Sequence, residues 1–486
     1  MLINKNIEKN FEYIKNTYNN SCDIVTRIIK KRGKKVGYIY LESVSSDNKI
    51  SDFLNKSLIK NITISSLLKN LENNIYNSHI TSCHKFSDIF YFLASGYTAL
   101  FIDNEDSCIV IETKTTLDRG ITESSSEPII RGPKDSFTEN HAVNLGLIRK
   151  RIKDPNLIFN EIKIGRRTKT KVSVAYINDI ADINKVNDII NNLKKINIDG
   201  ILDSGYVREF LNLNKSLFPQ TISTERPDLT CTSLLDGKIV ILVENTPYVL
   251  IIPGLFVDFI HSPEDNYQKP SNASFNRILR ILCFFITMLT PAIYIALMTF
   301  NPEIIPDQLL ISLAIQREGV PFPTAIEVLI FIITFEILRQ ADVHSPTVSG
   351  SAMNIVGALI LGDAAVNAGV VSPIAIIVIA VTCISELVFY DVDMINALRQ
   401  WRIIFIFATL FVGIIGLVAS LFVFVAKLSS LNSFQISYLN PISPLSITGI
   451  KNYFIRIKRT KLQNRVDYLS KNSKRMINYE ENINNN

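Results

Sequence analysis

The distribution of apolar residues constrains the fold of this chain more than any other feature of its sequence. Residues 279–428 are dominated by Ile, Val, Leu, Phe and Ala, whereas residues 1–278 are rich in Asn, Lys, Ile and Ser. A helix needs about 20 apolar residues to cross the hydrocarbon core of a bilayer, and only the middle block satisfies this requirement. We therefore expect an α/β soluble module, then an all-α polytopic membrane domain at 279–428, then a basic tail at 429–486.

The N-terminal module is expected to stay in the cytosol. Residues 1–20 contain Lys, Glu and Asn and no apolar run, so they do not read as a signal peptide. The 6 cysteines show no CxxC spacing and the 5 histidines are scattered, which predicts reduced thiols and no metal or cofactor. Because the module also lacks a Gly-rich phosphate loop and a nucleophile elbow, its sequence does not indicate an enzyme.

Two stretches of the soluble module share one pattern. An apolar strand at 36–41 precedes a polar turn and an amphipathic helix at 47–54, and a strand at 172–177 precedes a helix at 183–190 in the same way. Strand-like alternation followed by helix-like periodicity predicts one strand–helix unit in each stretch. The pattern indicates a duplication, and chance convergence of ordinary strand–helix patterns is the alternative.

A second pair of stretches supports the duplication. Residues 96–111 and 237–252 both read as hairpins in which two apolar strands flank a turn, at Asn104-Glu105 and Asn245-Thr246. We therefore predict two related α/β lobes. The expected domains are lobe 1 at 1–125 and lobe 2, with its connecting loop, at 126–275. A small ligand in the cleft between the lobes is suggested by fold-level analogy alone.

The membrane half contains about five predicted helical segments. The strongly apolar regions are 281–300, 324–338, 353–390 and 403–427. The third region is interrupted at 367–369 and by Ser372-Pro373, which predicts two helices at about 353–368 and 373–390. A cytosolic N-terminus and a cytosolic tail require an even number of crossings. Either one segment is re-entrant, with the short 324–338 favoured, or 306–316 or 431–450 contributes another.

The tail beyond the last apolar region is basic. Its cationic residues are Lys451, Arg456, Lys458, Arg459, Lys461, Arg465, Lys474 and Arg475. Cations on the cytosolic side of a membrane protein are typical of anchoring at a lipid surface. We therefore expect contact with membrane lipid and no binding of nucleic acid.

Acidic residues inside apolar helices are costly in lipid and are candidates for function. Glu327 is the first, and it has two interpretations: a capping box with Thr324, or a carboxylate that attracts cations at the mouth of a pore. Glu336 is nine residues later, on the opposite helix face. Its spacing from Arg339 predicts an ion pair.

Asp363 is a further candidate for an ion path, because it lies inside the long apolar run. Asn367 is one turn later and is placed to hydrogen-bond it, so a purely structural buried pair is the alternative. Small residues favour close contacts between helices. The glycines expected at such contacts are Gly362, Gly369, Gly413 and Gly416.

Several loops resemble those of one known family. The segments that carry the resemblance are Glu127-Pro128, Arg131 to Asn140, Asp203 to Tyr206, Phe218 to Gln220, Thr224 to Asp228, Glu264 to Tyr267, Gly319 to Pro323 and Gly362 to Val366. This series is similar to the A subunits of GerA-type spore germinant receptors, over about residues 30–445. The SpoVAF-type sporulation proteins are close relatives of that family.

The resemblance implies a function that the residues alone do not. It implies a subunit of the spore inner membrane, with its soluble module in the spore core. Its partners would be a transporter-like B subunit and a lipoprotein C subunit. It would self-associate, as a pentamer, into a nutrient-gated channel for monovalent cations. The alternative is a non-conducting scaffold that assembles the partner subunits. A secondary transporter is weaker, since no inverted repeat of helices is evident.

The loop residues of this family pattern are candidates for contacts between lobes or subunits. They are Arg131, Glu225, Arg226 and Asp228. Two interpretations remain open for them: ion pairs that hold the loops together, or a part in signalling.

Overall fold

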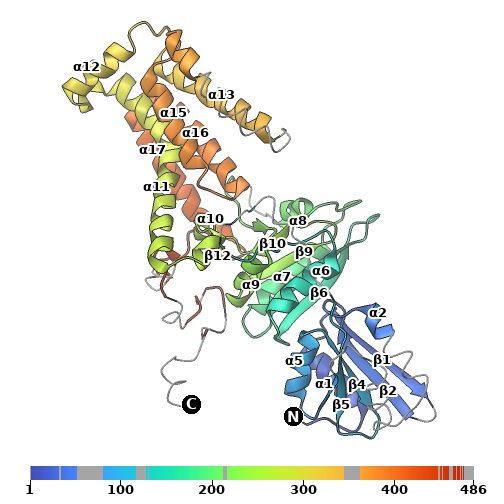
Figure 1. The fold of residues 1–486 in the computed structure, drawn as a ribbon. Helices are drawn as coiled ribbons and strands as arrows, with labels where there is room; N and C mark the ends of the chain where they lie inside the picture. The colour runs from blue at the N-terminus through green and yellow to red at the C-terminus, as the bar shows by residue number, and fades with distance from the viewer. Residues whose placement is uncertain are drawn as a thin grey trace.

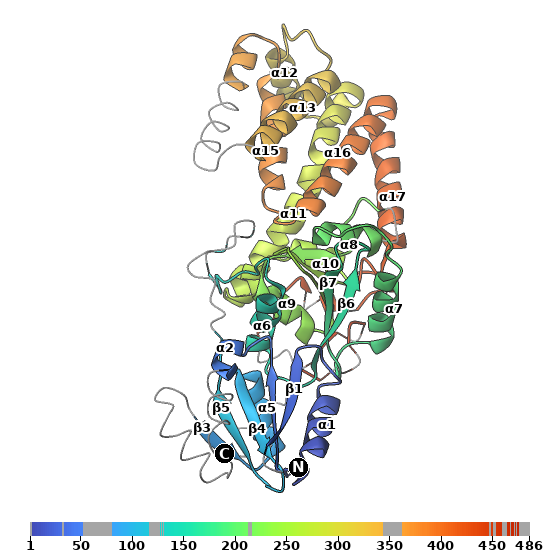
Figure 2. The same ribbon diagram turned by 90° about the vertical axis from the view of Figure 1, so that its right-hand side faces the viewer.

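The computed structural model (Figures 1 and 2) places the soluble module at one end of the molecule and the helical domain at the other. The structure describes residues 2–31, 34–51, 80–115, 127, 129, 131–211, 216–343 and 362–446. In the tail it describes 449–450, 453–458, 464–466, 468–470, 472, 474 and 475.

Lobe 1 is a five-stranded antiparallel sheet with helices packed on it. Its elements are α1 (Ile7–Thr17), β1 (Ile24–Lys31), β2 (Lys34–Leu41), α2 (Asp47–Ile50), β3 (Ile80–Cys83), α5 (Phe86–Ala94), β4 (Tyr97–Ile102) and β5 (Cys108–Glu112). The strand order is β1-β2-β4-β5-β3. Every neighbouring pair in this sheet is antiparallel.

Lobe 2 repeats this arrangement. Its elements are α6 (His141–Arg151), β6 (Leu157–Ile164), β7 (Thr170–Ile177), α7 (Ile183–Lys194), α8 (Ser204–Leu211), β8 (Ile222–Thr224), α9 (Pro227–Leu235), β9 (Ile239–Val243) and β10 (Val249–Ile252). The strand order β6-β7-β9-β10-β8 matches that of lobe 1 strand for strand. The prediction of two related α/β lobes is therefore confirmed.

The two lobes also share details of backbone conformation. Gly96 and Gly237, which end α5 and α9, both have positive φ, at 89° and 97°. Asn104 and Asn245, in the hairpin turns, have φ of 69° and 67°. Few residues other than Gly and Asn adopt this left-handed conformation. Coincidence of ordinary strand–helix patterns does not explain four matched positions of this kind.

A buried ion pair joins the two lobes. Arg149 of α6 and Asp23, which precedes β1, have fully buried side chains, and Arg149 Nη2 lies 3.1 Å from Asp23 Oδ2. Ser21 Oγ donates to Asp23 at 2.6 Å and accepts from the backbone N–H of Phe159 at 3.0 Å. The guanidinium also lies over the ring of Phe159, 4.8 Å from its centroid. The lobes are thus held by bonds that water does not reach.

The helical domain follows a short connection made of α10 (Phe256–Ile260) and η2 (Pro263–Asn266). Its elements are α11 (Pro270–Ile295), η3 (Ala296–Phe300), η4 (Pro302–Ile304), α12 (Asp307–Gln316), α13 (Thr324–Val343), α15 (Pro373–Glu386), α16 (Val392–Val412) and α17 (Ile414–Ser430). Helix α11 packs against α15 and α16 and buries Met288 with Ile379 and Phe405. Large apolar side chains such as Phe411 and Phe422 point outward, being 76% and 73% exposed.

The last predicted apolar segment, 403–427, is two helices rather than one. Helix α16 ends at Val412 and α17 begins at Ile414. Gly413 between them has φ of 66° and ψ of −144°, a conformation that is accessible in practice to glycine alone. The prediction of a single helix was wrong because the mean hydropathy of a segment does not reveal a single residue that breaks the helix.

The segments proposed to balance the number of crossings have different structures. The 306–316 stretch is the short helix α12, and α13 has 20 residues. A partial crossing at 324–338 stays a prediction, since α13 is not among the described helices that are long and apolar enough to cross a membrane. The 431–450 stretch folds back on lobe 2, where the Phe256 N–H donates to the Tyr438 carbonyl at 3.0 Å. Helix α11 leaves the soluble module and α17 returns to it (Figure 2), so the helical domain begins and ends on the same side.

Two helices in the described part of the chain are long and apolar enough to cross a membrane. They are Pro270–Phe300 and Val392–Val412, and the shorter apolar helices are Pro373–Glu386 and Ile414–Ser430. The predicted helix near 353–368 lies mostly outside the described residues, of which only 362–367 are helical. The exact domain boundaries remain predictions.

Candidate functional site

Glu327 is fully buried near the start of α13 and contacts the start of α15. Its Oε1 accepts hydrogen bonds from the backbone N–H of Ser372 at 2.5 Å and from the Ser372 hydroxyl at 2.6 Å. Because Ser372 is the N-cap of α15, the carboxylate satisfies a free N–H at the positive end of that helix. The capping-box interpretation with Thr324 is therefore wrong: Glu327 caps a different helix.

The second carboxylate oxygen of Glu327 has fewer polar contacts than the first. Oε2 lies 4.0 Å from Arg317 Nε, and neither atom has a hydrogen-bond partner in the part of the chain that the structure describes. A buried carboxylate oxygen without a hydrogen bond costs about 1–3 kcal/mol or more. Such an oxygen is a candidate site for a cation or for water.

Asp363 and Asn367 are both exposed in the single chain. Within residues 362–446 the structure shows no hydrogen bond between them, so the buried pair with Asn367 is not formed. Neither residue joins the Glu327–Ser372 contact. The candidate ion-path residues thus occupy two places, one inside the helix packing and one on its surface.

The four candidate packing glycines have different roles. Gly416 is a true close contact, since a Cβ there would lie 2.1 Å from the Ala408 carbonyl oxygen. Gly413 combines its helix break with contact to Phe300, 2.8 Å from where a Cβ would lie. Gly362 would make only ordinary contact with Ile376, at 3.9 Å.

Gly369 makes no close contact within the described part of the chain. It follows the helical residues 362–367 with φ of 67°, and nothing lies within 4 Å of where its Cβ would be. Its N–H donates to the Val366 carbonyl, and the N–H of Val370 donates to that of Ala365. This is the pattern of a glycine that ends a helix, and helix packing at Gly369 stays a prediction.

Five charged side chains from α13, α15 and α16 form one network inside the helical domain. Glu386 accepts from Arg402 at 3.0 Å and from Arg399 Nε at 2.5 Å. Glu336 lies 3.1 Å from Arg402 and from Arg399, and accepts from Arg339 at 2.7 Å. The side chains of Arg402 and Arg399 are only 2% and 8% exposed. Removal of any buried member would leave the others without charge compensation.

Sequence reasoning found only part of this network. The ion pair of Glu336 with Arg339 was predicted from helical spacing and is confirmed. Glu386, near the end of α15, is buried. Arg399 and Arg402 were missed because the last apolar region was taken to start at 403. The sequence did contain a signal: Arg399 and Arg402 stand directly before the apolar region that begins at 403, close enough to belong to the same helix.

Arg226 is the centre of the loop contacts in lobe 2. Its Nη2 donates to the Pro133 carbonyl at 3.0 Å and to Asp228 Oδ2 at 2.9 Å. Asp228 Oδ2 also accepts from the Tyr267 hydroxyl at 2.6 Å, just before the helical domain. Arg226 is 1% exposed, so this cluster ties the connecting loop, α9 and the start of the helical domain together.

The other two loop candidates differ in exposure. Arg131 is exposed. Glu225 is buried, and its backbone carbonyl accepts from the N–H of Phe137 at 2.8 Å. These contacts favour the interpretation that ion pairs hold the loops together, and a role in contacts between subunits remains a prediction.

A small cavity of about 310 Å³ lies where lobe 2 meets the helical domain. Arg208 of α8 forms an ion pair with Asp393 of α16 at its edge. Glu127 and Asp391 also line it. Burial raises the pKa of Glu127 to about 7, against the lowering effects of Thr224 and Arg226, which lie beside it.

Asp391 has the same kind of environment as Glu127. Burial raises its pKa to about 6, although its side chain accepts a hydrogen bond from the backbone N–H of Met394 at 2.9 Å. Both carboxyls therefore change charge between pH 5 and 8, at the joint between the soluble module and α16.

The cleft between the lobes is acidic. A cavity of about 480 Å³ there is lined by four glutamates, together with Asp23, His141 and Lys171. The glutamates are Glu42, Glu139, Glu161 and Glu244. Burial lowers the pKa of His141, so the imidazole is neutral at pH 7. Binding of a ligand in this cleft remains a prediction.

Comparison with known proteins places the chain in a family. Residues 12–468 match the sequence profile described as Bacillus/Clostridium GerA spore germination protein. The chain is 36% identical to spore germination protein KA of Bacillus subtilis, over 98% of this chain and 88% of that protein. It is 34% identical to the uncharacterized membrane protein YfkQ of Bacillus subtilis, over 93% of this chain and 89% of that protein.

One solved structure also matches. It is the N-terminal domain of the A subunit of the Bacillus megaterium spore germinant receptor GerK3, at 31% identity and a TM-score of 0.43. The match covers 53% of this chain and 98% of that domain.

A duplicated soluble module joined to apolar helices with a buried charge network defines a membrane-associated protein in two parts. The family match is specific enough to go further. The chain belongs to the GerA family of spore germination proteins, which is a family of germination proteins rather than a known class of enzymes.

Proposed function

We propose that this chain is the membrane subunit of a nutrient-responsive spore germinant receptor, and that it oligomerises to form or gate a channel for monovalent cations. The family supports the receptor role, since its members at 30–36% identity include several spore germination proteins. The apolar helices, which start and end on the side of the soluble module, support a multi-pass topology with that module in the cytosol or spore core.

The observation that supports the channel is the exposure of Asp363 and Asn367. Both lie on helical residues 362–367, within the apolar region 353–390. A carboxylate and an amide facing lipid are strongly unfavourable. In the membrane these side chains require water or a second copy of the chain, and a pore between copies supplies both.

The receptor would act in the spore inner membrane with a transporter-like B subunit and a lipoprotein C subunit, as the family resemblance implies. Copies of this chain would assemble as a pentamer around the pore. The exposed apolar faces of α16 and α17, which include Phe411 and Phe422, are then available to lipid and to neighbouring subunits.

Ion release tests this proposal. The chain is co-reconstituted with its B and C partners in potassium-loaded vesicles, nutrients are added, and potassium efflux is recorded. We expect efflux with the natural chain and a changed efflux rate with Asp363→Asn. Asp307→Asn serves as the matched control, because Asp307 is also exposed but lies in the short helix α12. An unchanged rate with Asp363→Asn would remove this residue from the ion path.

The alternative is a non-conducting scaffold that assembles the partner subunits. The observation in its favour is that Glu327, Glu336 and Glu386 are all engaged by groups of the same chain. Chemical cross-linking separates the two: a chain that stays monomeric or dimeric with all partners present, and that releases no potassium, is a scaffold.

A further inference from the structure

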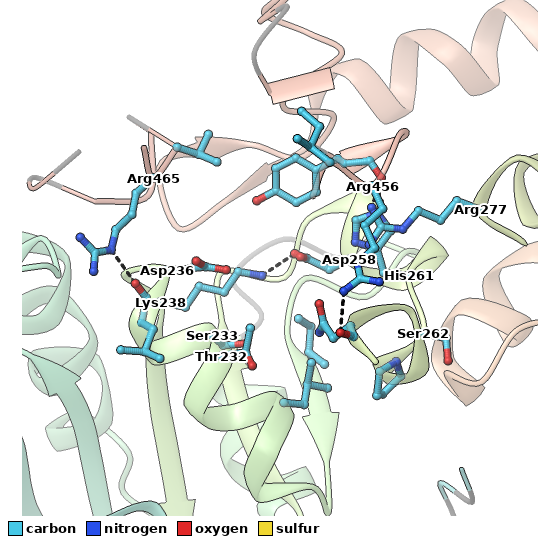
Figure 3. Close-up of a pocket in the computed structure, with 18 of the residues that line it drawn as sticks. Thr232, Ser233, Asp236, Lys238, Asp258, His261, Ser262, Arg277, Arg456 and Arg465 are labelled. Atoms are coloured by element: carbon cyan, nitrogen blue, oxygen red, sulfur yellow. Dashed lines mark hydrogen bonds and ion pairs between the residues drawn. The ribbon is translucent and has the colours of Figure 1, made fainter. Parts of the chain in front are cut away.

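The cavity where the tail meets lobe 2 is spanned by contacts within the chain (Figure 3). It has a volume of about 400 Å³ and is lined by α9, the α10–η2 connection, the foot of α11 and the tail. Arg465 donates to the Leu235 carbonyl at 2.6 Å, and Arg475 forms an ion pair with Asp236. These contacts bind the tail to the soluble module, and contact of the tail with lipid stays a prediction. The groups with unused chemistry lie elsewhere, in lobe 1.

Two cysteines of lobe 1 lie directly opposite each other in the sheet. Cys83 is the last residue of β3 and Cys108 is the first residue of β5, and the antiparallel register pairs them. Side chains that are directly opposite in an antiparallel pair lie on the same face of the sheet. Their Cα atoms are about 4.5–5.5 Å apart, which is within the range of about 4.4–6.8 Å found across disulfides. The backbone therefore allows a bond between the two sulfurs without rearrangement.

The two thiols are free and in contact. Cys83 is 4% exposed and Cys108 is 1% exposed, and both belong to the core that also contains Phe86 of α5. Their side chains share a hydrogen bond, which lowers the pKa of the Cys83 thiol and raises the pKa of the Cys108 thiol. Because the thiolate is the nucleophile in thiol chemistry, Cys83 is the attacking group of the pair.

The position of Cys83 gives it a route to solvent. Strand β3 has four residues and lies at the edge of the five-stranded sheet. Thr81 and Ser82 before the cysteine are exposed, and so is His84 after it. Short terminal elements open locally at a small cost in free energy. Opening of β3 exposes Cys83 while β4 and β5 stay paired.

The duplicated fold provides an internal comparison for these two positions. In lobe 2 the last residue of β8 pairs with the first residue of β10, as β3 does with β5 in lobe 1, and these residues are Thr224 and Val249. The same sheet is therefore completed without cysteine at either position. Packing of the fold does not by itself explain two facing thiols in lobe 1.

We propose that Cys83 and Cys108 form a reversible disulfide that holds β3 onto β5. The oxidant is a low-molecular-weight disulfide. The Cys83 thiolate attacks one of its sulfurs, which forms a mixed disulfide and releases one small thiol. The sulfur of Cys108 then attacks Cys83 and displaces the second small thiol. Two electrons pass from the protein sulfurs to the small disulfide, and the two protons of the cysteines are carried by the released thiols. The proposal does not depend on ion conduction.

The test uses the full chain purified in detergent and incubated with oxidised glutathione. Remaining thiols are blocked with N-ethylmaleimide, the chain is digested, and the peptides are identified by mass spectrometry. We expect a peptide in which Cys83 is joined to Cys108, and dithiothreitol should separate its two parts. This measurement needs no substitution, so it does not depend on the folding of a variant.

Two variants test the order of the steps. In Cys108→Ser the second thiol is absent, so Cys83 should keep one glutathione as a mixed disulfide, whereas Cys83→Ser should leave Cys108 unmodified. The matched control is Cys231→Ser in α9 of lobe 2, which changes a cysteine that is also buried, at 6% exposed. The control should form the Cys83–Cys108 bond as the natural chain does. Glutathione retained on Cys108 rather than on Cys83 would overturn the assigned roles.

Thermal melting of the same samples measures the effect on the fold. A disulfide stabilises mainly by constraining the unfolded chain, so the oxidised natural chain should melt about 6–12 °C above the reduced chain. Oxidised and reduced Cys108→Ser should melt at the same temperature. Absence of the joined peptide from the natural chain, or a joined peptide without any change in melting temperature, would overturn the proposal.

Discussion

Glu127 gives the sharpest prediction, because its pKa of about 7 makes the joint between module and helices sensitive to pH. The usual pKa of this carboxyl in the unfolded chain is 4.5. The folded chain therefore holds more protons than the unfolded chain at intermediate pH. By linkage, this carboxyl makes the folded state less stable as pH rises from about 4.5 through about 7.

The change Glu127→Gln removes this penalty. The difference of about 2.5 between the folded and unfolded pKa, at about 1.4 kcal/mol for each, is about 3 kcal/mol at pH 8 and about zero below pH 4. The Gln carbonyl still accepts the hydrogen bond that Thr224 now donates to Glu127 at 2.7 Å. For a soluble module of this size we expect a melting temperature about 6–12 °C higher at pH 8.

The assay is thermal melting of the full chain in detergent, from pH 4 to pH 8.5. The control Glu209→Gln changes an exposed carboxyl on α8 and should leave the pH profile unchanged. The melting temperatures of the natural chain and of Glu127→Gln should converge near pH 4 and separate as pH rises from about 4.5 to about 7. A difference that is the same at every pH would refute the reasoning, because a structural effect of the substitution does not titrate.

Three further changes test other contacts. Arg149→Met should cost about 3–5 kcal/mol by leaving Asp23 buried and unpaired, and the loss should shrink in the Asp23→Asn background; chemical denaturation of the full chain measures both. Arg402→Gln should cost several times more than Arg339→Gln in detergent melting, because Arg402 is buried and Arg339 is 38% exposed. Gly413→Ala should cost about 1–3 kcal/mol by strain alone, seen as loss of folded, detergent-extractable protein.

The architecture of the soluble module was predictable because its signals are local. Asn104 and Asn245 mark hairpin turns through their own backbone preferences, so the two lobes were recognisable without long-range information. Gly96 and Gly237 end the corresponding helices α5 and α9 for the same reason. Strand order was not predicted, because it depends on pairing between segments far apart in the chain.

The candidate site was predicted only in part, because its partners are distant in sequence. Glu336 and Arg339 are one helical turn apart and were paired correctly, whereas Arg402 reaches Glu336 across 66 positions. One of the two interpretations of Glu327 placed its partner in its own helix, because no local pattern points to Ser372. Helical periodicity states which residues share a face, but not which helix that face meets.

The buried pair of Arg149 and Asp23 has a mechanical consequence. Separation of a desolvated ion pair leaves two buried charges uncompensated, so this joint resists displacement of one lobe against the other. A rotation of lobe 1 is therefore expected to carry lobe 2 with it, and the ion pair of Arg208 with Asp393 links lobe 2 to α16. The duplicated module is thus expected to move as one rigid unit rather than as two lobes that open and close.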